Sequence, residues 1–194
     1  MKSSLFILLS GFLVCSISAF KCIRACEEEI VIPMKISQLS TVHLDNRGQQ
    51  PLELGPGAEG FLQAYGFRLF VQNALVNPAD SLQLDDVCAA PVSSEVISTC
   101  KIFRIGSTPD GMQTKHDVSA WFRYVDRTGS VPAYRSVQEM LNYLQEEPTT
   151  LQDKAIDFVM VTPPTFKGIF VFELQLTTED STVYATTTAP IYLQ

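Results

Sequence analysis

Apolar and polar residues alternate along much of this chain, with the period of two that is typical of β-strands. The clearest run lies near the end, where Phe170, Phe172, Leu174 and Leu176 share one face. A polar turn separates this run from residues 183–188, which are rich in β-branched side chains. Two such runs around a polar turn predict a β-hairpin.

Shorter alternating runs predict further strands. Residues 30–36 form one of them, and Pro33 within it predicts an edge strand, because proline cannot donate a hydrogen bond to a neighbouring strand. The other predicted strands lie at 65–71, at 95–105 and around Phe158 and Met160, with a Gly/Pro-rich loop at 51–60. Such closely spaced strands predict an all-β fold, an immunoglobulin-like β-sandwich.

Residues 134–147 have the period of an α-helix instead. Their apolar side chains recur at offsets of three, four and seven residues, and Ser136 and Glu139 have the spacing of a capping box. Pro148 marks the end, because proline cannot continue a helix. The sequence therefore predicts one amphipathic helix near 134–147, added over an open end or edge of the sandwich. A shorter helical turn is predicted at 117–122.

The first residues of the chain predict export. Lys2 precedes an apolar run from Leu5 to Val14, and small residues follow as far as Ala19. This is the layout of a secretory signal peptide. The run is too short to cross a bilayer, which takes about 20 apolar residues.

The leader also sets the predicted domain organisation. Residues 1–18 form the signal peptide, residues 19–29 form a tether with cysteines and glutamates, and residues 30–194 form a single β-sandwich domain. The alternative is a lipoprotein, whose mature chain begins with a lipidated cysteine. Three cysteines could serve, although none follows a favourable sequence: Cys15, Cys22 and Cys26.

The cysteines fit an oxidising compartment. The chain has five of them, and four remain if Cys15 leaves with the leader, which is consistent with two disulfides. The candidates are Cys22, Cys26, Cys88 and Cys100. Proximity favours pairing the first two and the last two, and the other pairings stay open. A zinc site is less well supported, because the spacing is unusual for a pair of zinc knuckles. We therefore expect neither a metal nor a cofactor.

The charge of the chain restricts its partners. It has 14 basic and 21 acidic residues among 194, a formal net charge of −7. An acidic chain lacks the clustered lysine and arginine that bind phosphates, so nucleic acid is not expected as a partner. Membrane contact is expected only through a possible N-terminal lipid anchor.

The sequence holds no recognisable catalytic set. Its two histidines, His43 and His116, lie in strand-like and turn-like surroundings, and no Gly-X-Ser-X-Gly motif is present. The glutamates at 27–29 have the character of a solvated charge run. Several aspartates are candidates for calcium binding or for hydrolysis, although their spacing matches no known calcium-binding loop. They are Asp85, Asp86, Asp153 and Asp157. Aromatic residues at 121–124 could form an exposed platform, although core packing is the commoner role of such residues.

Several short motifs resemble those of an uncharacterised family of exported proteins from Bacteroidetes-type bacteria, many of them lipoproteins. The motifs are Tyr65–Leu69, Cys88–Pro91, Asp117–Ser119, Phe170–Leu174 and Thr186–Thr188. The resemblance implies a location in the periplasm, on the outer membrane surface or outside the cell, and it transfers no catalytic residue. The leader departs from the family because it lacks a clean lipidation motif.

These observations predict a non-enzymatic envelope or cell-surface protein, an interaction module for an unknown protein or glycan. The alternative is a secreted hydrolase with a carboxylate-based site that the sequence does not reveal. The scarcity of histidines and the lack of a nucleophile motif favour the first.

Overall fold

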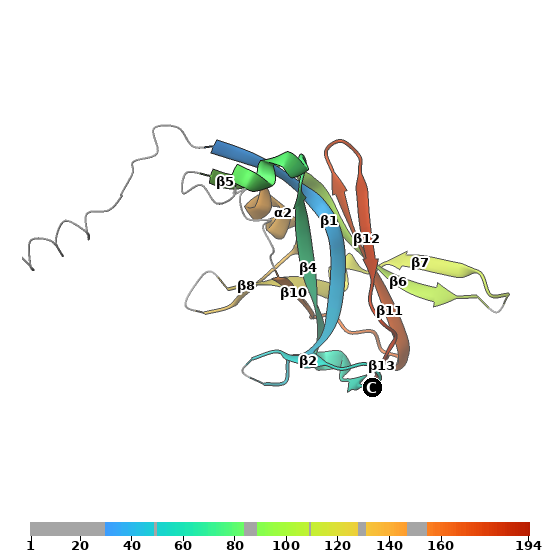
Figure 1. The fold of residues 1–194 in the computed structure, drawn as a ribbon. Coiled ribbons are helices and arrows are strands. Elements are labelled where there is room, and N and C mark those ends of the chain that lie inside the picture. Colours follow the sequence, from blue (N-terminus) through green and yellow to red (C-terminus); the bar gives the residue numbers. More distant parts are fainter. Residues whose placement is uncertain (1–29, 49, 84–88, 109, 128–130, 147–154) are drawn as a thin grey trace, which may run out of the picture.

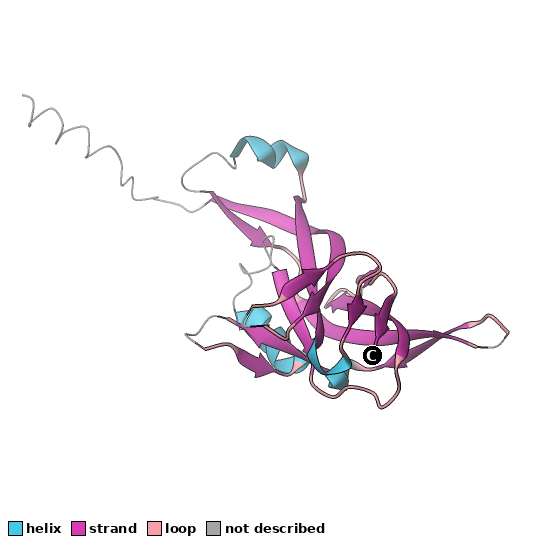
Figure 2. Ribbon diagram, turned by 90° about the horizontal axis from the view of Figure 1, so that it is seen from below, coloured by secondary structure: helices cyan, strands magenta, loops and turns pink. Residues whose placement is uncertain are grey.

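The computed structural model describes residues 30–48, 50–83, 89–108, 110–127, 131–146 and 155–194. The strands of these residues form two sheets (Figures 1 and 2). The coarse prediction of an all-β sandwich is therefore confirmed. No helix in the described part of the chain is long and apolar enough to cross a membrane.

The first sheet, sheet 1, has seven strands. Their order is β2 (Leu52–Leu54), β1 (Ile30–Asp45), β4 (Tyr65–Leu75), β10 (Ala155–Met160), β8 (Phe122–Asp126) and β9 (Ala133–Arg135), with β5 (Ala89–Ser93) parallel to the start of β1. Strands β2 and β3 lie within the segment predicted as loop, so that prediction is wrong in part.

The second sheet, sheet 2, has six strands. Their order is β3 (Glu59–Gly60), β13 (Ile191–Leu193), β11 (Gly168–Thr178), β6 (Ile97–Ser107) and β7 (Gln113–Asp117), with β12 (Val183–Thr187) also paired to β11. The predicted hairpin is present as β11 and β12, in register from Thr177 opposite Val183 to Glu173 opposite Thr187. The β6–β7 hairpin projects from the body in both views (Figures 1 and 2).

Aromatic rings from both sheets join them into one core. Phe67 of β4 stacks on Phe158 of β10 with centroids 5.1 Å apart, and both rings are fully buried. Phe122 of β8 contacts Phe67 and, across the sandwich, Phe172 of β11, each at 5.3 Å. Such ring pairs contribute about 0.5–1.5 kcal/mol each beyond their buried area. The alternation that predicted the strands therefore also supplies the core.

Strand β1 differs from the prediction of an edge strand, because it pairs with β4 on one side and with β2 and β5 on the other. Pro33 lies one residue beyond the last registered β1–β4 pair, Met34 opposite Leu75. Its carbonyl still accepts a hydrogen bond from the Val76 N–H at 3.1 Å. On the side of β4 the proline is tolerated because it stands at the end of that ladder. On the side of β5 it lies within the parallel ladder, opposite Val92.

A β-bulge between Ile36 and Gln38 lets both halves of β1 face the core. Before the bulge the even-numbered Ile36 faces the core, and after it the odd-numbered Leu39 and His43 do, opposite Val71 and Phe67 of β4. Leu44, on the opposite face of the strand, is buried as well. At the bulge, the Ile36 N–H donates to the Glu95 carboxylate, which also accepts a hydrogen bond from the Tyr184 hydroxyl of β12. This bond raises the pKa of Tyr184 to about 12. Glu95 thus links the two sheets.

The α-helix of the described residues, α2 (Val137–Glu146), lies within the predicted segment. Its capping box is formed: the Ser136 N–H donates to the Glu139 carboxylate at 2.7 Å, and the Glu139 N–H donates to the Ser136 hydroxyl at 3.2 Å. Val137, Met140 and Leu141 are buried in the core. The described residues also form three 3₁₀ turns: η1 (Leu62–Ala64), η2 (Pro78–Gln83) and η3 (Ser119–Trp121), the last within the predicted 117–122 turn.

Gly66 allows β4 to approach β10, and its replacement tests that packing. A Cβ atom there would lie 2.4 Å from the Phe158 carbonyl oxygen and 2.7 Å from the Asn46 side-chain nitrogen. We expect Gly66→Ala to lower the free energy of unfolding by about 1–3 kcal/mol, measured by urea denaturation, because backbone must move. The control is Gly55→Ala, where the added Cβ meets nothing within 4 Å. Equal effects of the two substitutions would contradict this account.

Candidate functional site

A row of side chains crosses the outer face of sheet 1, the face turned away from sheet 2. Arg68 of β4 lies opposite Asp157 of β10. On β8, Arg123 lies opposite Val159 and Val125 lies opposite Tyr134 of β9. Because side chains alternate between the two faces of a strand, all of these residues share the face opposite to the buried phenylalanines.

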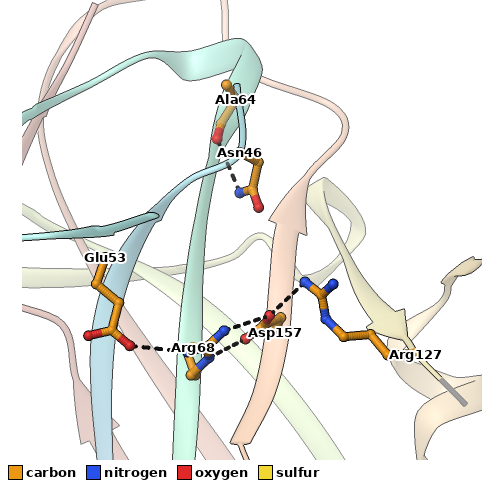
Figure 3. Close-up of polar contacts among 6 residues, drawn as sticks. All are labelled: Asn46, Glu53, Ala64, Arg68, Arg127 and Asp157. Carbon is orange, nitrogen blue, oxygen red and sulfur yellow. Dashed lines mark hydrogen bonds and ion pairs between the residues drawn. The ribbon is translucent and has the colours of Figure 1, made fainter. Parts of the chain in front are cut away.

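Asp157 is the buried centre of this face, with 4 % of its surface exposed. Arg68 binds it with two parallel hydrogen bonds, from Nε to Oδ1 at 2.6 Å and from Nη2 to Oδ2 at 3.1 Å. Arg127 donates from Nη2 to Oδ2 at 3.0 Å, reaching Asp157 from the side opposite Arg68 (Figure 3). Arg68 also donates to Glu53 at 3.0 Å. The hydrogen bonds to Asp157 raise the pKa of the Arg68 guanidinium.

This arrangement suits electrostatic binding better than acid–base catalysis. Both Asp157 oxygens are engaged by guanidinium donors, so the carboxylate is poorly placed to take a proton from a substrate. The arginine side chains remain partly accessible, with 24 % of Arg68 and 45 % of Arg127 exposed. We call these two arginines with Asp157 the arginine cluster.

Two open hollows lie beside η1, on either side of Gln63 and Pro163, which line both. The larger, about 480 Å³, is also lined by Phe61, Lys167 and other residues of the 163–167 loop. The smaller, about 360 Å³, is also lined by Tyr134, Val159, Met160 and Val161. We call the two hollows together the groove. Tyr134 and Val159 belong to the outer face of sheet 1, so the smaller hollow and the arginine cluster lie on the same face of this sheet, although neither arginine nor Asp157 lines the hollow.

The groove is aromatic and mostly uncharged. Tyr134 is 63 % exposed. The Phe61 ring at the other end carries the Arg47 guanidinium 3.9 Å from its centroid. Among the lining residues Lys167 has the one charged side chain, and none has an acidic side chain. Aromatic rings with a few amide groups are typical of sites that bind polar organic ligands.

His43 has a structural role instead. Its Nε2 lies 2.9 Å from the Ala189 carbonyl, an acceptor, so Nε2 carries the proton. Its Nδ1 then accepts from the Tyr65 hydroxyl at 2.9 Å. Burial lowers the pKa of His43, an effect partly offset by the hydrogen bond to Ala189. The neutral histidine thus ties β1 to the connection between β12 and β13.

The other predicted candidates are dispersed. His116 is exposed on β7, opposite Arg104. Phe122 and Tyr124 are buried and Trp121 packs against the core, so the aromatic segment belongs to the core rather than to a platform. The described residues contain no group of three potential metal ligands. Several candidates lie outside the described residues: Glu27, Glu28, Glu29, Asp85, Asp86 and Asp153.

The structure does not support the disulfide expected at Cys100. This cysteine is free, and burial raises the pKa of its thiol to about 12. Its side chain points into the core from β6, so it is also unsuited to act as a nucleophile. The remaining candidates for disulfides or lipidation lie outside the described residues: Cys15, Cys22, Cys26 and Cys88.

No protein-family model matches the chain, and no curated protein is significantly similar to it. The site is therefore defined by its geometry, with no residue transferred from a relative. Sequence reasoning missed Arg68, Arg127, Tyr134 and Gln63. Alternation could have placed Arg68 on the outer face of its strand, but its partner Asp157 lies 89 residues further along the chain.

The lowered pKa of His43 predicts a pH-dependent stability. The unfolded histidine titrates near pH 6.5, above the folded one, so the unfolded chain binds more protons below that pH. We expect the free energy of unfolding to fall as the pH is lowered from about 7.5 to about 5.5, before most carboxylates titrate. His43→Gln should remove this dependence, while His116→Gln, at an exposed position, should retain it. An unchanged slope in His43→Gln would show that another group is responsible.

Proposed function

We propose that this protein is an exported, non-enzymatic binding module that holds a glycan in its groove. The observation that carries the proposal is the pair of adjoining hollows that share Gln63 and Pro163 and end at the exposed ring of Tyr134. Two hollows that share part of their lining suit two successive units of a linear ligand. An open groove also lets the ligand extend beyond both ends.

The chemistry of the groove favours a glycan over a peptide. A tyrosine ring presents an apolar face to the C–H face of a sugar, and its hydroxyl stays available for hydrogen bonds. The amides of Gln63 and Gln194 each offer both donors and an acceptor, which matches sugar hydroxyls. A peptide bound by strand addition needs a free strand edge. The smaller hollow has such an edge at β9, the terminal strand that bears Tyr134, but the larger hollow is lined mainly by η1 and the 163–167 loop.

Binding is favoured over hydrolysis for reasons of geometry. Hydrolysis of a glycosidic bond takes two carboxyl groups that face the substrate. No acidic side chain lines the groove, and Asp157, on the same face of sheet 1, is held by two arginines. These contacts support the non-enzymatic proposal and disfavour the hydrolase.

The cellular setting belongs to the same proposal. It combines the predicted leader, an envelope or extracellular location, and membership of the exported Bacteroidetes-type family. Lipid attachment at a cysteine of the leader would tether the module to a membrane. An immunoglobulin-like relationship stays a prediction, because two packed sheets are common to many sandwich folds.

Replacing Tyr134 tests the proposed function. The full chain is first screened against an array of neutral and acidic oligosaccharides, and the affinity of a bound one is measured by calorimetry. We expect Tyr134→Ala to weaken binding about tenfold, because a lost stacking contact is worth about 1.4 kcal/mol. The matched control is Tyr192→Ala, which removes a tyrosine from β13 of sheet 2 that is 44 % exposed.

Two results would contradict the proposal. One is equal binding by Tyr134→Ala and the wild type. The other is an array without any bound saccharide, together with binding of the chain to an extended peptide, which would assign the groove to a protein partner.

A further inference from the structure

We infer that the glycan is acidic, and that Arg127 binds a carboxylate of it with the help of Arg68. This inference rests on the proposed function and deepens it by naming the ligand class. On this inference, the arginine cluster makes the site prefer a negatively charged glycan over a neutral one. Tyr134 and Gln63 bind the sugar rings.

The first argument is position. Val125 lies opposite Tyr134, and Arg127 follows Val125 by two residues along the chain, which returns it to the same side of the sheet. The Arg127 guanidinium reaches back over the sheet to Asp157, two residues before Val159 on β10. Val159 and Tyr134 both line the smaller hollow. A ligand in this hollow can therefore extend along the sheet to the guanidinium of Arg127.

The second argument is the number of unused donors. A guanidinium has five N–H donors. Within the described part of the chain, Arg127 makes one hydrogen bond, to Asp157, and the side chain is 45 % exposed. Arg68 uses donors on all three of its nitrogens, for Asp157 and Glu53. Arg127 is thus the arginine that keeps donors for a ligand, while Arg68 supplies further positive charge behind it.

The third argument is charge. Two guanidinium groups share the single Asp157 carboxylate, and the next acid, Glu53, lies on the far side of Arg68 (Figure 3). Glu53 is also ion-paired with Arg68, so the two guanidinium groups are matched by two carboxylates. The further positive charge on this face is that of Arg123, which lies opposite Val159 and donates to the backbone carbonyls of Ala120 and Phe122. Lys167 at the far end of the groove has the same sign. An anionic group on the ligand would balance this local charge.

The fourth argument is preorganisation. The hydrogen bond to Asp157 already restricts the Arg127 side chain, so this side chain loses less conformational freedom when a ligand binds. A planar guanidinium matches a carboxylate through two parallel hydrogen bonds, as Arg68 does with Asp157 in the same cluster. This favours the carboxylate of a uronic acid over an uncharged hydroxyl at this position.

The test compares two ligands that differ only in whether their carboxyl groups are free or methyl-esterified. An oligogalacturonate and its fully methyl-esterified form have the same sugars and length, but only the first has free carboxylates. We expect the full chain to bind the acid at least tenfold more tightly than the ester. Arg127→Gln should reduce binding of the acid to the level of the ester and leave binding of the ester unchanged.

Two further variants make the result specific. Lys115→Gln is the matched control: Lys115 is also 45 % exposed and also has one carboxylate partner, Glu173, but lies on sheet 2. It should bind both ligands as the wild type does. Arg127→Lys keeps the charge and the contact with Asp157 but loses the planar fork, so it should bind the acid with intermediate affinity. Thermal unfolding checks that each variant folds. If Arg127→Gln does not fold, the affinity of Arg127→Lys for the acid tests the inference instead.

The possible failures are distinguishable. Equal binding of acid and ester, with both dependent on Tyr134, would overturn the acidic-ligand inference and leave the proposed function standing. Tighter binding of a sulfated oligosaccharide of the same length would overturn the assignment to a carboxylate. Binding of no saccharide at all would overturn both proposals.

Discussion

The buried carboxylate of Asp157 is the constraint on which the outer face of sheet 1 depends. An unpaired charge in such a place would cost several kcal/mol, so the fold must bring cations to it. Arg68 arrives from the neighbouring strand and Arg127 from the end of β8. A shift of β10 by one residue would turn Asp157 into the core and Phe158 out of it. The ion pairs and the aromatic core therefore require the same register.

The same register creates the surface that we propose to bind a ligand. With Arg68 fixed opposite Asp157, Val159 lies next to Gly66, where the close approach of β4 and β10 leaves no room for a side chain. β10 ends at Met160, and the chain then leads into Pro163 and Pro164 beside η1. The groove thus begins where the paired part of the sheet ends. Packing places the groove there, on the same face of sheet 1 as the arginine cluster.

Local patterns were sufficient for the elements whose interactions are local. The alternation in β11 predicted the hairpin, and the three-residue spacing of Ser136 and Glu139 predicted the start of α2, because those contacts lie close in sequence. The sequence did not fully predict strand β1, because its bulge moves the core-facing positions from even to odd residues and because Pro33 suggested an edge strand. Tyr134 was assigned to the start of the helix, whereas it belongs to β9. The arginine cluster was out of reach, because Asp157 meets Arg68 only after β4 and β10 have paired.

The central claim is that the outer face of sheet 1, organised by Asp157, is a binding surface for an acidic glycan. Mapping of backbone amide shifts by NMR during titration of the isotope-labelled protein with an oligogalacturonate tests it most directly. The account predicts that the largest shift changes fall on η1, on the β8–β9 pair, on residues 157–167 and on Gln194, with little change in the β6–β7 hairpin or in β12 of sheet 2. Changes confined to sheet 2, such as the β6–β7 hairpin, or no changes at saturating ligand, would contradict it.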